Sequence, residues 1–248
     1  EITLLGQNVN AYNFKGKRLS DLIKEISKIK NLKRIRYTTS HPIDFTEDLI
    51  KIHNTSEKLM PLINLPVQSG SNKILKMMNR KHTIKDYLNI ITKLKMFKKN
   101  IQFSSDFIIG YPGETDKDFD LTIQLMKKVK YINSFSFIFS PRPGTPAANM
   151  KPIDESIAKK RLIIFQKIAN EIKLNYRKNL LNKNSLVLFE NKIGSKNEFF
   201  GRDEYLNSVI VKTNENLEGK IKEVKIVSGN QNTLYGETTQ KKETEFAA

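Results

Sequence analysis

Five polar segments in the first 150 residues, four of them with glycine, hold most of the side chains that could bind a small molecule. They are residues 6–10, 38–42, 66–71, 104–114 and 140–146. Each segment follows an apolar run and, taken singly, could be an ordinary turn. If one edge of a sheet gathered all five, they would form a pocket of amides, hydroxyls and carboxylates, which suits a ligand with several functional groups.

Two of these segments offer backbone groups to a ligand. Gly70 and Ser71 directly precede a helical run, so their N–H groups could hold an anionic or ribose-bearing group, or could simply start the helix. A Gly-Pro-Gly turn follows Asp106 and would let a ligand approach the chain closely. Glu114 could act there, or could serve as an acid in the first turn of the next helix.

Other residues limit the kinds of chemistry that the chain could perform. Arg142 stands between two prolines, which suits a guanidinium aimed at phosphate or carboxylate, or a salt bridge that holds the loop. The chain has no cysteine and only three histidines, His41, His53 and His82. We therefore expect no disulfide, no cysteine nucleophile and no metal ligands.

Alternating strand-like and helix-like runs must position these segments, as in βαβ units with a parallel sheet. The expected strands are residues 1–6, 33–39, 61–66, 101–109 and 134–139. Helical stripes lie between them, one of them after the N-cap candidate Thr83 and another from about Thr115. This pattern predicts a (β/α) barrel, or part of one, with its chemistry at the C-terminal strand ends.

The last third of the chain has a different spacing of apolar residues. A long helix is expected over 153–179, and short strands over 185–190, 197–201, 206–212, 219–227 and 232–238. These strands predict a small antiparallel β barrel, followed by a disordered tail. Because Glu1 is not Met and already reads as strand, we expect the true start to lie upstream.

The net charge of +17, from 43 basic and 26 acidic residues, favours a polyanionic partner such as nucleic acid. Codon drift is an alternative, because most of the cations are lysines in a chain rich in Ile and Asn. No apolar run is long enough to span a bilayer, so we expect a soluble protein with no membrane partner.

Six ordered motifs carry a family resemblance. They are Gly-Gln-Asn-Val-Asn-Ala-Tyr at 6–12, Thr-Thr-Ser-His-Pro at 38–42, Leu-Pro-Val-Gln-Ser-Gly-Ser at 65–71, Met-Asn-Arg at 78–80, Ser-Asp-Phe-Ile-Ile-Gly-Tyr-Pro-Gly-Glu-Thr at 105–115 and Ser-Pro-Arg-Pro-Gly-Thr-Pro-Ala at 140–147. Together they resemble the radical S-adenosylmethionine (SAM) methylthiotransferases, in the branch that acts on tRNA. The resemblance is dense over 1–150 and looser from 151 to 240.

The resemblance implies an α/β fold: a partial radical SAM (β/α) barrel, strands 2 to 6, followed by a small antiparallel β-barrel TRAM domain. The implied domains are an incomplete radical SAM core at 1–150, a linking helix at 151–181, an RNA-binding TRAM domain at 182–240 and a tail at 241–248. The family's first barrel strand, its cysteine-containing cluster loop and its N-terminal domain have no counterpart in this sequence.

The family adds a 2-methylthio group to N6-isopentenyladenosine at tRNA position 37, with SAM and 4Fe-4S clusters as cofactors. Carried over by motif, the cofactor-binding residues are Gln7, Asn8, Gln68, Ser69, Asp106, Gly110 and Glu114. The substrate-binding residues are Ser40, His41, Arg80, Arg142 and Arg202. Because the cluster cysteines are absent, the resemblance implies no metal ligand and no catalytic residue within this chain.

For the RNA, the TRAM-like region offers Phe199, Phe200, Arg202 and Tyr205 beside Lys196. At least one Phe could instead fill the barrel. Basic residues of the long helix could extend an RNA-binding face or form a solvated surface; they are Lys159, Lys160, Arg161, Arg177 and Lys178.

Three interpretations stay open. The chain is part of a working cytoplasmic enzyme that binds the tRNA anticodon stem-loop and is completed by a missing N-terminal chain. Alternatively, it is an inactive remnant or split product that only binds RNA or nucleoside. An unrelated phosphate-binding barrel enzyme is the third, disfavoured because no acid-base pair or metal site presents itself.

Overall fold

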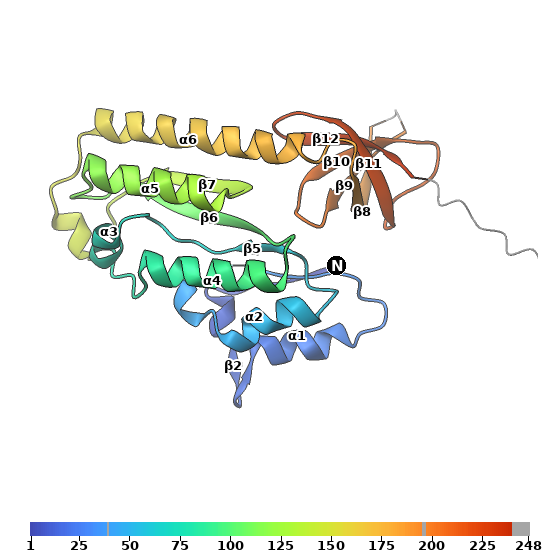
Figure 1. Ribbon diagram of the computed structural model, residues 1–248, viewed down its shortest axis with the longest axis horizontal. Coiled ribbons are helices and arrows are strands. Elements are labelled where there is room, and N and C mark those ends of the chain that lie inside the picture. The colour runs from blue at the N-terminus through green and yellow to red at the C-terminus, as the bar shows by residue number, and fades with distance from the viewer. Residues whose placement is uncertain (39, 195–196, 240–248) are drawn as a thin grey trace, which may run out of the picture. The chain divides into compact units, whose positions relative to one another are not determined.

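The computed structural model describes residues 1–38, 40–194 and 197–239. Lys196 and the expected tail at 241–248 lie outside these residues. The chain divides into two compact units, Glu1–Ile172 and Lys173–Ala248. Each unit is described by itself (Figure 1).

Five parallel strands form the frame of the first unit. They are β1 (Ile2–Leu4), β4 (Ile35–Tyr37), β5 (Leu62–Asn64), β6 (Gln102–Ile109) and β7 (Asn133–Ile138). β1 pairs with β4, and β5, β6 and β7 pair in chain order, all in parallel. A parallel bridge between Ile35 and Leu59 connects the two groups. The predicted parallel arrangement is confirmed, and within the described residues β1 and β7 each pair on one side only.

Helices connect these strands and flank them (Figure 1). They are α1 (Leu19–Ser27), α2 (Glu47–Thr55), α3 (Asn72–Met77), α4 (Ile84–Phe97) and α5 (Asp116–Val129). Thr83 and Thr115 begin α4 and α5 with capping boxes, because each hydroxyl accepts an N–H three residues later and each N–H donates to an Asp there. Three 3-10 turns complete the unit: η1 (Val9–Ala11), η2 (Pro42–Asp44) and η3 (Pro146–Asn149).

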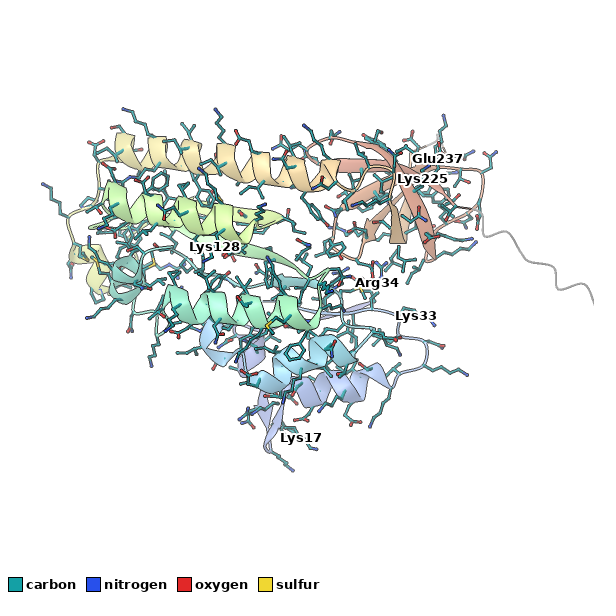
Figure 2. All side chains as sticks on the ribbon, viewed as in Figure 1. Lys17, Lys33, Arg34, Lys128, Lys225 and Glu237 are labelled. Carbon is teal, nitrogen blue, oxygen red and sulfur yellow. The ribbon has the colours of Figure 1, made fainter. Side chains whose placement is uncertain are left out.

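Two elements of the first unit were not expected from the sequence. One is α2. The other is a hairpin of β2 (Asn13–Phe14) and β3 (Lys17–Arg18), which turns through Lys15 and Gly16 at φ of 49° and 79°. Its strands have two residues each, too few to show an alternating pattern. Figure 2 shows Lys17 on this hairpin, well separated from Lys33 and Lys128, so cations are spread over the unit.

Aromatic side chains pack among Leu, Ile and Val residues in the core between the strands and the helices. The Tyr131 hydroxyl donates to the Tyr87 hydroxyl at 3.0 Å, and the Tyr87 hydroxyl donates to the Leu65 carbonyl at 2.9 Å. Phe107 of β6 lies 4.8 Å from Phe165, measured between ring centroids. Phe165 belongs to α6 (Glu155–Lys178), so the first part of this long helix packs on the sheet.

The second unit is a closed five-stranded barrel in the order β10-β12-β11-β8-β9. The strands are β8 (Asn184–Ile193), β9 (Glu198–Asp203), β10 (Ser208–Lys212), β11 (Ile221–Gly229) and β12 (Thr233–Thr238). Every pair is antiparallel except β10 with β12, which is parallel. The expected small antiparallel β barrel is confirmed, and it contains one parallel pair because alternating directions cannot close around an odd number of strands.

Small and large residues share the barrel interior. Phe199 is buried there, as one reading of the sequence expected. Gly201 allows β8 to approach, since a Cβ at this position would lie 2.4 Å from the Leu188 carbonyl oxygen. Arg177, in the last turn of α6, donates to the Asn230 and Asn232 carbonyls at 2.8 and 3.2 Å. Arg177 is therefore a buried residue that holds this turn, and it does not belong to a basic surface.

Candidate functional site

A cavity of about 790 Å³ lies where β5, β6 and β7 end, and four of the expected site residues line it. They are Gln68, Arg80, Asp106 and Arg142. Much of the remaining wall is apolar, from Met77, Met78, Ile108, Tyr111, Phe137, Phe139, Pro146 and Ala147. The cavity thus joins an apolar wall to a few polar groups, which is the usual composition of a small-molecule site.

Strand pairing fixes the acidic and amide side of the cavity. The Gln68 N–H donates to the Asp106 carbonyl at 3.0 Å, and its carbonyl accepts from the Ile108 N–H at 2.9 Å. Gln68 has φ of 73°, so the chain leaves the strand direction at this residue. Burial raises the pKa of the Asp106 carboxyl, although a hydrogen bond from Asn64 opposes the shift.

Two arginines supply the basic side of the cavity. Arg80 follows α3, where Asn79 at φ of 56° ends the helix. Burial lowers the pKa of the Arg80 guanidinium. Among the described residues, no carboxylate lies within ion-pair distance of Arg80 or Arg142. The salt-bridge alternative for Arg142 is thus not seen, and the cavity carries more positive than negative charge.

Glu114 supports the Gly110 turn from behind and is absent from the cavity wall. Its Oε1 accepts the Gly110 N–H at 3.2 Å and the Arg161 Nη1 at 2.8 Å. The carboxylate is 1% exposed. Burial raises the pKa of Glu114, and the bonds from Gly110 and Arg161 oppose this. Arg161, expected on a helix surface, is therefore a buried partner of this turn.

Gly110 is not on the wall of the first cavity but lines a second cavity of about 700 Å³, against the segment that leads into α6. Phe139 and Ala147 belong to the walls of both cavities. Gly110 has φ of +74°, and a Cβ here would lie 2.9 Å from the Ala158 Cβ of α6. The turn thus depends on glycine both for its backbone conformation and for close packing.

Besides Gly110 and Glu114, three more expected cofactor residues lie away from the first cavity's wall. Ser69 is buried, and its Oγ accepts the Ser71 N–H at 3.2 Å and lies 3.4 Å from the Thr122 Oγ1 of α5. Gln7 and Asn8 follow β1 and are exposed. The Asn8 amide donates to Asp44 at 2.6 Å. The structure therefore does not bring Gln7, Asn8 or Ser69 to the side chains of that wall.

Ser40 and His41 follow β4 and meet a residue that the motif analysis passed over, His82. The Asn10 side chain holds His41 by exchanging two 2.8 Å hydrogen bonds with its backbone. The His41 and His82 rings lie 5.7 Å apart, edge to face. His82 directly follows Arg80 and Lys81 in the sequence, which was the one available signal for its role.

Arg202 lies on β9 in the second unit. Its Nε donates to Glu190 at 3.0 Å, and its guanidinium carbon lies 5.4 Å from the Phe200 ring centroid. Its side chain is 45% exposed. The turn beside it is fixed by buried Asp203, which accepts the Tyr205 N–H at 2.8 Å. An exposed guanidinium over an aromatic ring therefore lies on this strand.

Within the described residues, no three acidic or histidine side chains gather as a metal site would require. The sequence has no cysteine, so it does not fit an iron-sulfur cluster held by thiolates. In the same part of the chain, no helix combines the length and apolar character needed to cross a membrane.

Comparison with known families rules out the third interpretation, an unrelated barrel enzyme. The family model described as the radical SAM superfamily matches residues 1–126. The chain belongs to the radical SAM superfamily. Relatives in this superfamily are similar over its whole length, so the sequence resemblance is confirmed.

Two of these relatives are each named tRNA-2-methylthio-N(6)-dimethylallyladenosine synthase. The protein of Pelagibacter ubique (strain HTCC1062) is 54% identical over 253 residues, which cover 100% of this chain and 56% of that protein. The protein of Rickettsia canadensis (strain McKiel) is 49% identical over 244 residues, covering 96% and 55%. The chain thus spans about half the length of these relatives.

A solved radical SAM structure supports the fold. Coproporphyrinogen III oxidase (HemN) from Escherichia coli, described as a radical SAM enzyme, superposes with a TM-score of 0.50 at 11% identity. The superposition covers 75% of this chain and 52% of that protein. The predicted class, a partial radical SAM barrel followed by a small β barrel, is confirmed.

Proposed function

We propose that this chain belongs to a tRNA methylthiotransferase, in which it binds SAM and the tRNA anticodon stem-loop. The enzyme adds a 2-methylthio group to N6-isopentenyladenosine at tRNA position 37. The observation that carries the proposal is the cavity shared by Gln68, Arg80, Asp106 and Arg142. The names of the relatives support the choice of reaction.

The cavity suits SAM by size and by donor set. Its apolar wall can cover an adenine ring, while the Gln68 amide and the Asp106 carboxyl can bond hydroxyl, ammonium or ring-edge groups. When bound, SAM supplies the radical chemistry and the methyl group. The protein's part is to orient this cofactor and to exclude water from it. Gly110 and Glu114 act behind the wall by fixing the turn after β6.

Other positions in the chain keep the roles expected for them as part of this proposal. Gln7, Asn8 and Ser69 are the further cofactor candidates, and Ser40 and His41 the further substrate candidates. Since Gln7 and Asn8 are exposed, they are open to a ligand that extends toward β1. Ser69 is buried against α5, so its hydroxyl can affect the cofactor only by shaping the loop.

The 4Fe-4S clusters of the family reaction require ligands that this sequence does not contain. We propose that a missing N-terminal chain provides them, in a cytoplasmic enzyme, and that this chain alone is inactive. The alternative is a remnant or split product that binds RNA or nucleoside without catalysis. Anaerobic reconstitution of the 248-residue chain tests inactivity, and uptake of iron or release of 5′-deoxyadenosine would contradict it.

SAM binding tests the first half of the proposal. We expect isothermal titration to detect SAM binding to the whole chain, and Gln68→Ala to weaken it about tenfold through loss of hydrogen bonds, each worth about 1 kcal/mol. Gln124→Ala is the matched control, because Gln124 is exposed on α5 away from the cavity. Equal SAM affinity of the two variants would remove Gln68 from the site.

The second unit is proposed to bind the anticodon stem-loop as a TRAM domain. Arg202 over Phe200 combines a cation with a stacking surface, which suits single-stranded RNA. Arg202→Ala should weaken stem-loop binding and reduce its salt dependence, whereas Lys225→Ala, an exposed cation on β11, should do less. If the two variants match at every salt concentration, Arg202 does not bind the RNA.

A further inference from the structure

Beside the first cavity, two loops of the first unit bring the His41 and His82 rings within 5.7 Å of each other, and among the described residues they carry three buried polar atoms without a hydrogen-bond partner. Ser40 and His41 come from the loop after β4, and Arg80 and His82 come from the loop between α3 and α4. Arg80 also lines the cavity. The cluster therefore adjoins the proposed SAM site but comes from different segments of the chain.

The unused groups in this cluster are deeply buried. Ser40 is 5% exposed and His82 is 6% exposed. Within the described part of the chain, neither the Ser40 hydroxyl nor either ring nitrogen of His82 has a hydrogen-bond partner. Buried polar atoms are nearly always paired, so these atoms need an explanation. A ligand oxygen beside them would accept their hydrogens.

The charges around the cluster favour a negative ligand. Burial lowers the pKa of both His41 and His82, that of His82 to about 4, and the charge of Arg80 lowers each of them further. Asp44 and Asp86 oppose these shifts, but both are engaged elsewhere. Asp44 accepts from Asn8, and Asp86 caps α4 through Thr83.

A buried water molecule would pair Ser40 or His82 but would leave the Arg80 charge uncompensated. A neutral nucleobase edge would leave it uncompensated as well. An oxyanion meets both needs, since it accepts hydrogen bonds from hydroxyl, imidazole and guanidinium and also neutralises the cation. Arginine is the cation most suited to such a group.

We propose that Ser40, His41, Arg80 and His82 form an oxyanion subsite beside the cavity, in which His82 is a binding residue. The subsite would take a phosphodiester of the RNA or the carboxylate of SAM, and for this choice of ligand it rests on the proposed function. The anion's charge is neutralised by Arg80, and its oxygens accept from Ser40 and from the imidazole N–H groups.

The three histidines allow a test on the whole chain by NMR, with one of them as an internal control. His53 is buried in the core, lies 2.6 Å from the Tyr37 hydroxyl through Nε2, and belongs to α2. Inorganic phosphate and dimethyl phosphate are titrated against chloride at constant ionic strength, while the ring resonances of all three histidines are followed. Free methionine and SAM form the carboxylate arm.

We expect phosphate to shift the His41 and His82 resonances in a saturable way and to raise the pKa of His82 by about one unit. The His53 signals should not change. Arg80→Gln should weaken phosphate binding about tenfold, whereas Lys81→Gln, an exposed neighbour with the same charge, should not. Unchanged His53 signals in each variant show that it has folded.

The titrated compounds that shift the His41 and His82 resonances identify the source of the anion. Saturation by dimethyl phosphate assigns the subsite to RNA, and saturation only by methionine and SAM assigns it to the cofactor. If no anion shifts His41 and His82, if His53 shifts equally, or if Arg80→Gln binds the anion that acts as well as Lys81→Gln does, the subsite does not exist. The phosphate arm contains neither SAM nor RNA, so its result is independent of the proposed function.

Discussion

Replacing Arg161 by methionine should destabilise the first unit more than any single change on the exposed side of α6. Arg161 Nη1 donates to the Glu114 Oε1 at 2.8 Å and to the Glu114 carbonyl at 3.2 Å. The guanidinium side chain is 8% exposed and the carboxylate 1%. Methionine keeps much of the volume but removes every donor, so Glu114 retains only the Gly110 N–H.

The magnitude follows from leaving one member of a buried ion pair without its partner, which costs about 3–5 kcal/mol. The bond from Arg161 to Asp116 adds little, because Asp116 is 94% exposed. Glu114 can escape part of the cost by taking up a proton, and its pKa is already raised above the ordinary 4.5. We therefore expect a loss of about 3 kcal/mol near neutral pH.

The pH dependence has a defined sign. Loss of Arg161 raises the pKa of Glu114 in the folded state still further, while the unfolded value does not change. A folded carboxyl with a raised pKa holds its proton more tightly than the unfolded one, so stability falls as pH rises above the unfolded value. The loss caused by Arg161→Met should be larger at pH 8 than at pH 5.

Urea denaturation followed by circular dichroism at pH 5 and pH 8 measures this change in the free energy of unfolding. Lys160→Met is the matched control, since Lys160 is exposed on the same helix. The double variant Arg161→Met with Glu114→Gln should recover part of the stability by removing the buried charge. If Arg161→Met behaves like Lys160→Met, or if the stability that it loses relative to the unsubstituted protein is larger at pH 5 than at pH 8, the argument fails.

Three further predictions concern the turn, the barrel and the sheet edges. Gly110→Ala should cost about 1–3 kcal/mol more than Gly16→Ala in urea denaturation, because both have positive φ but only Gly110 also meets a side chain of α6. Arg177→Met should lower the melting temperature of the second unit by calorimetry, whereas Lys178→Met should not, because only Arg177 holds the turn at 230–232. The outer edges of β1 and β7 should make the chain self-associate, and light scattering that shows a monomer at all concentrations would contradict this.

Long, strongly patterned elements were predictable from the sequence because local chemistry determines them. Thr83 and Thr115 each precede an acid by three residues, and both start helices as expected. The five parallel strands and the long helix were located to within a few residues. The hairpin at 13–18 was missed because it depends on two turn residues with positive φ, Lys15 and Gly16. Its strands are too short to show a repeating pattern.

The candidate site was only partly predictable, since motif spacing does not show which way a side chain points. Gln68 and Asp106 reach the cavity, whereas Glu114 turns back to Arg161 and Ser69 turns to α5. Arg161 lies 47 positions from Glu114, so no local pattern could pair them. His82 was missed because its significance comes from unpaired ring nitrogens, which a sequence does not reveal.

The central claim, that SAM occupies the cavity at the ends of β5, β6 and β7, can be tested at the methionines. The chain has six methionines, of which Met77 and Met78 line the cavity, Met126 is in the core and Met96 is 76% exposed. With methyl-labelled methionine, titration with SAM should shift the Met77 and Met78 methyl resonances and leave those of Met126 and Met96 in place. Saturable SAM binding that leaves Met77 and Met78 unshifted would contradict the claim.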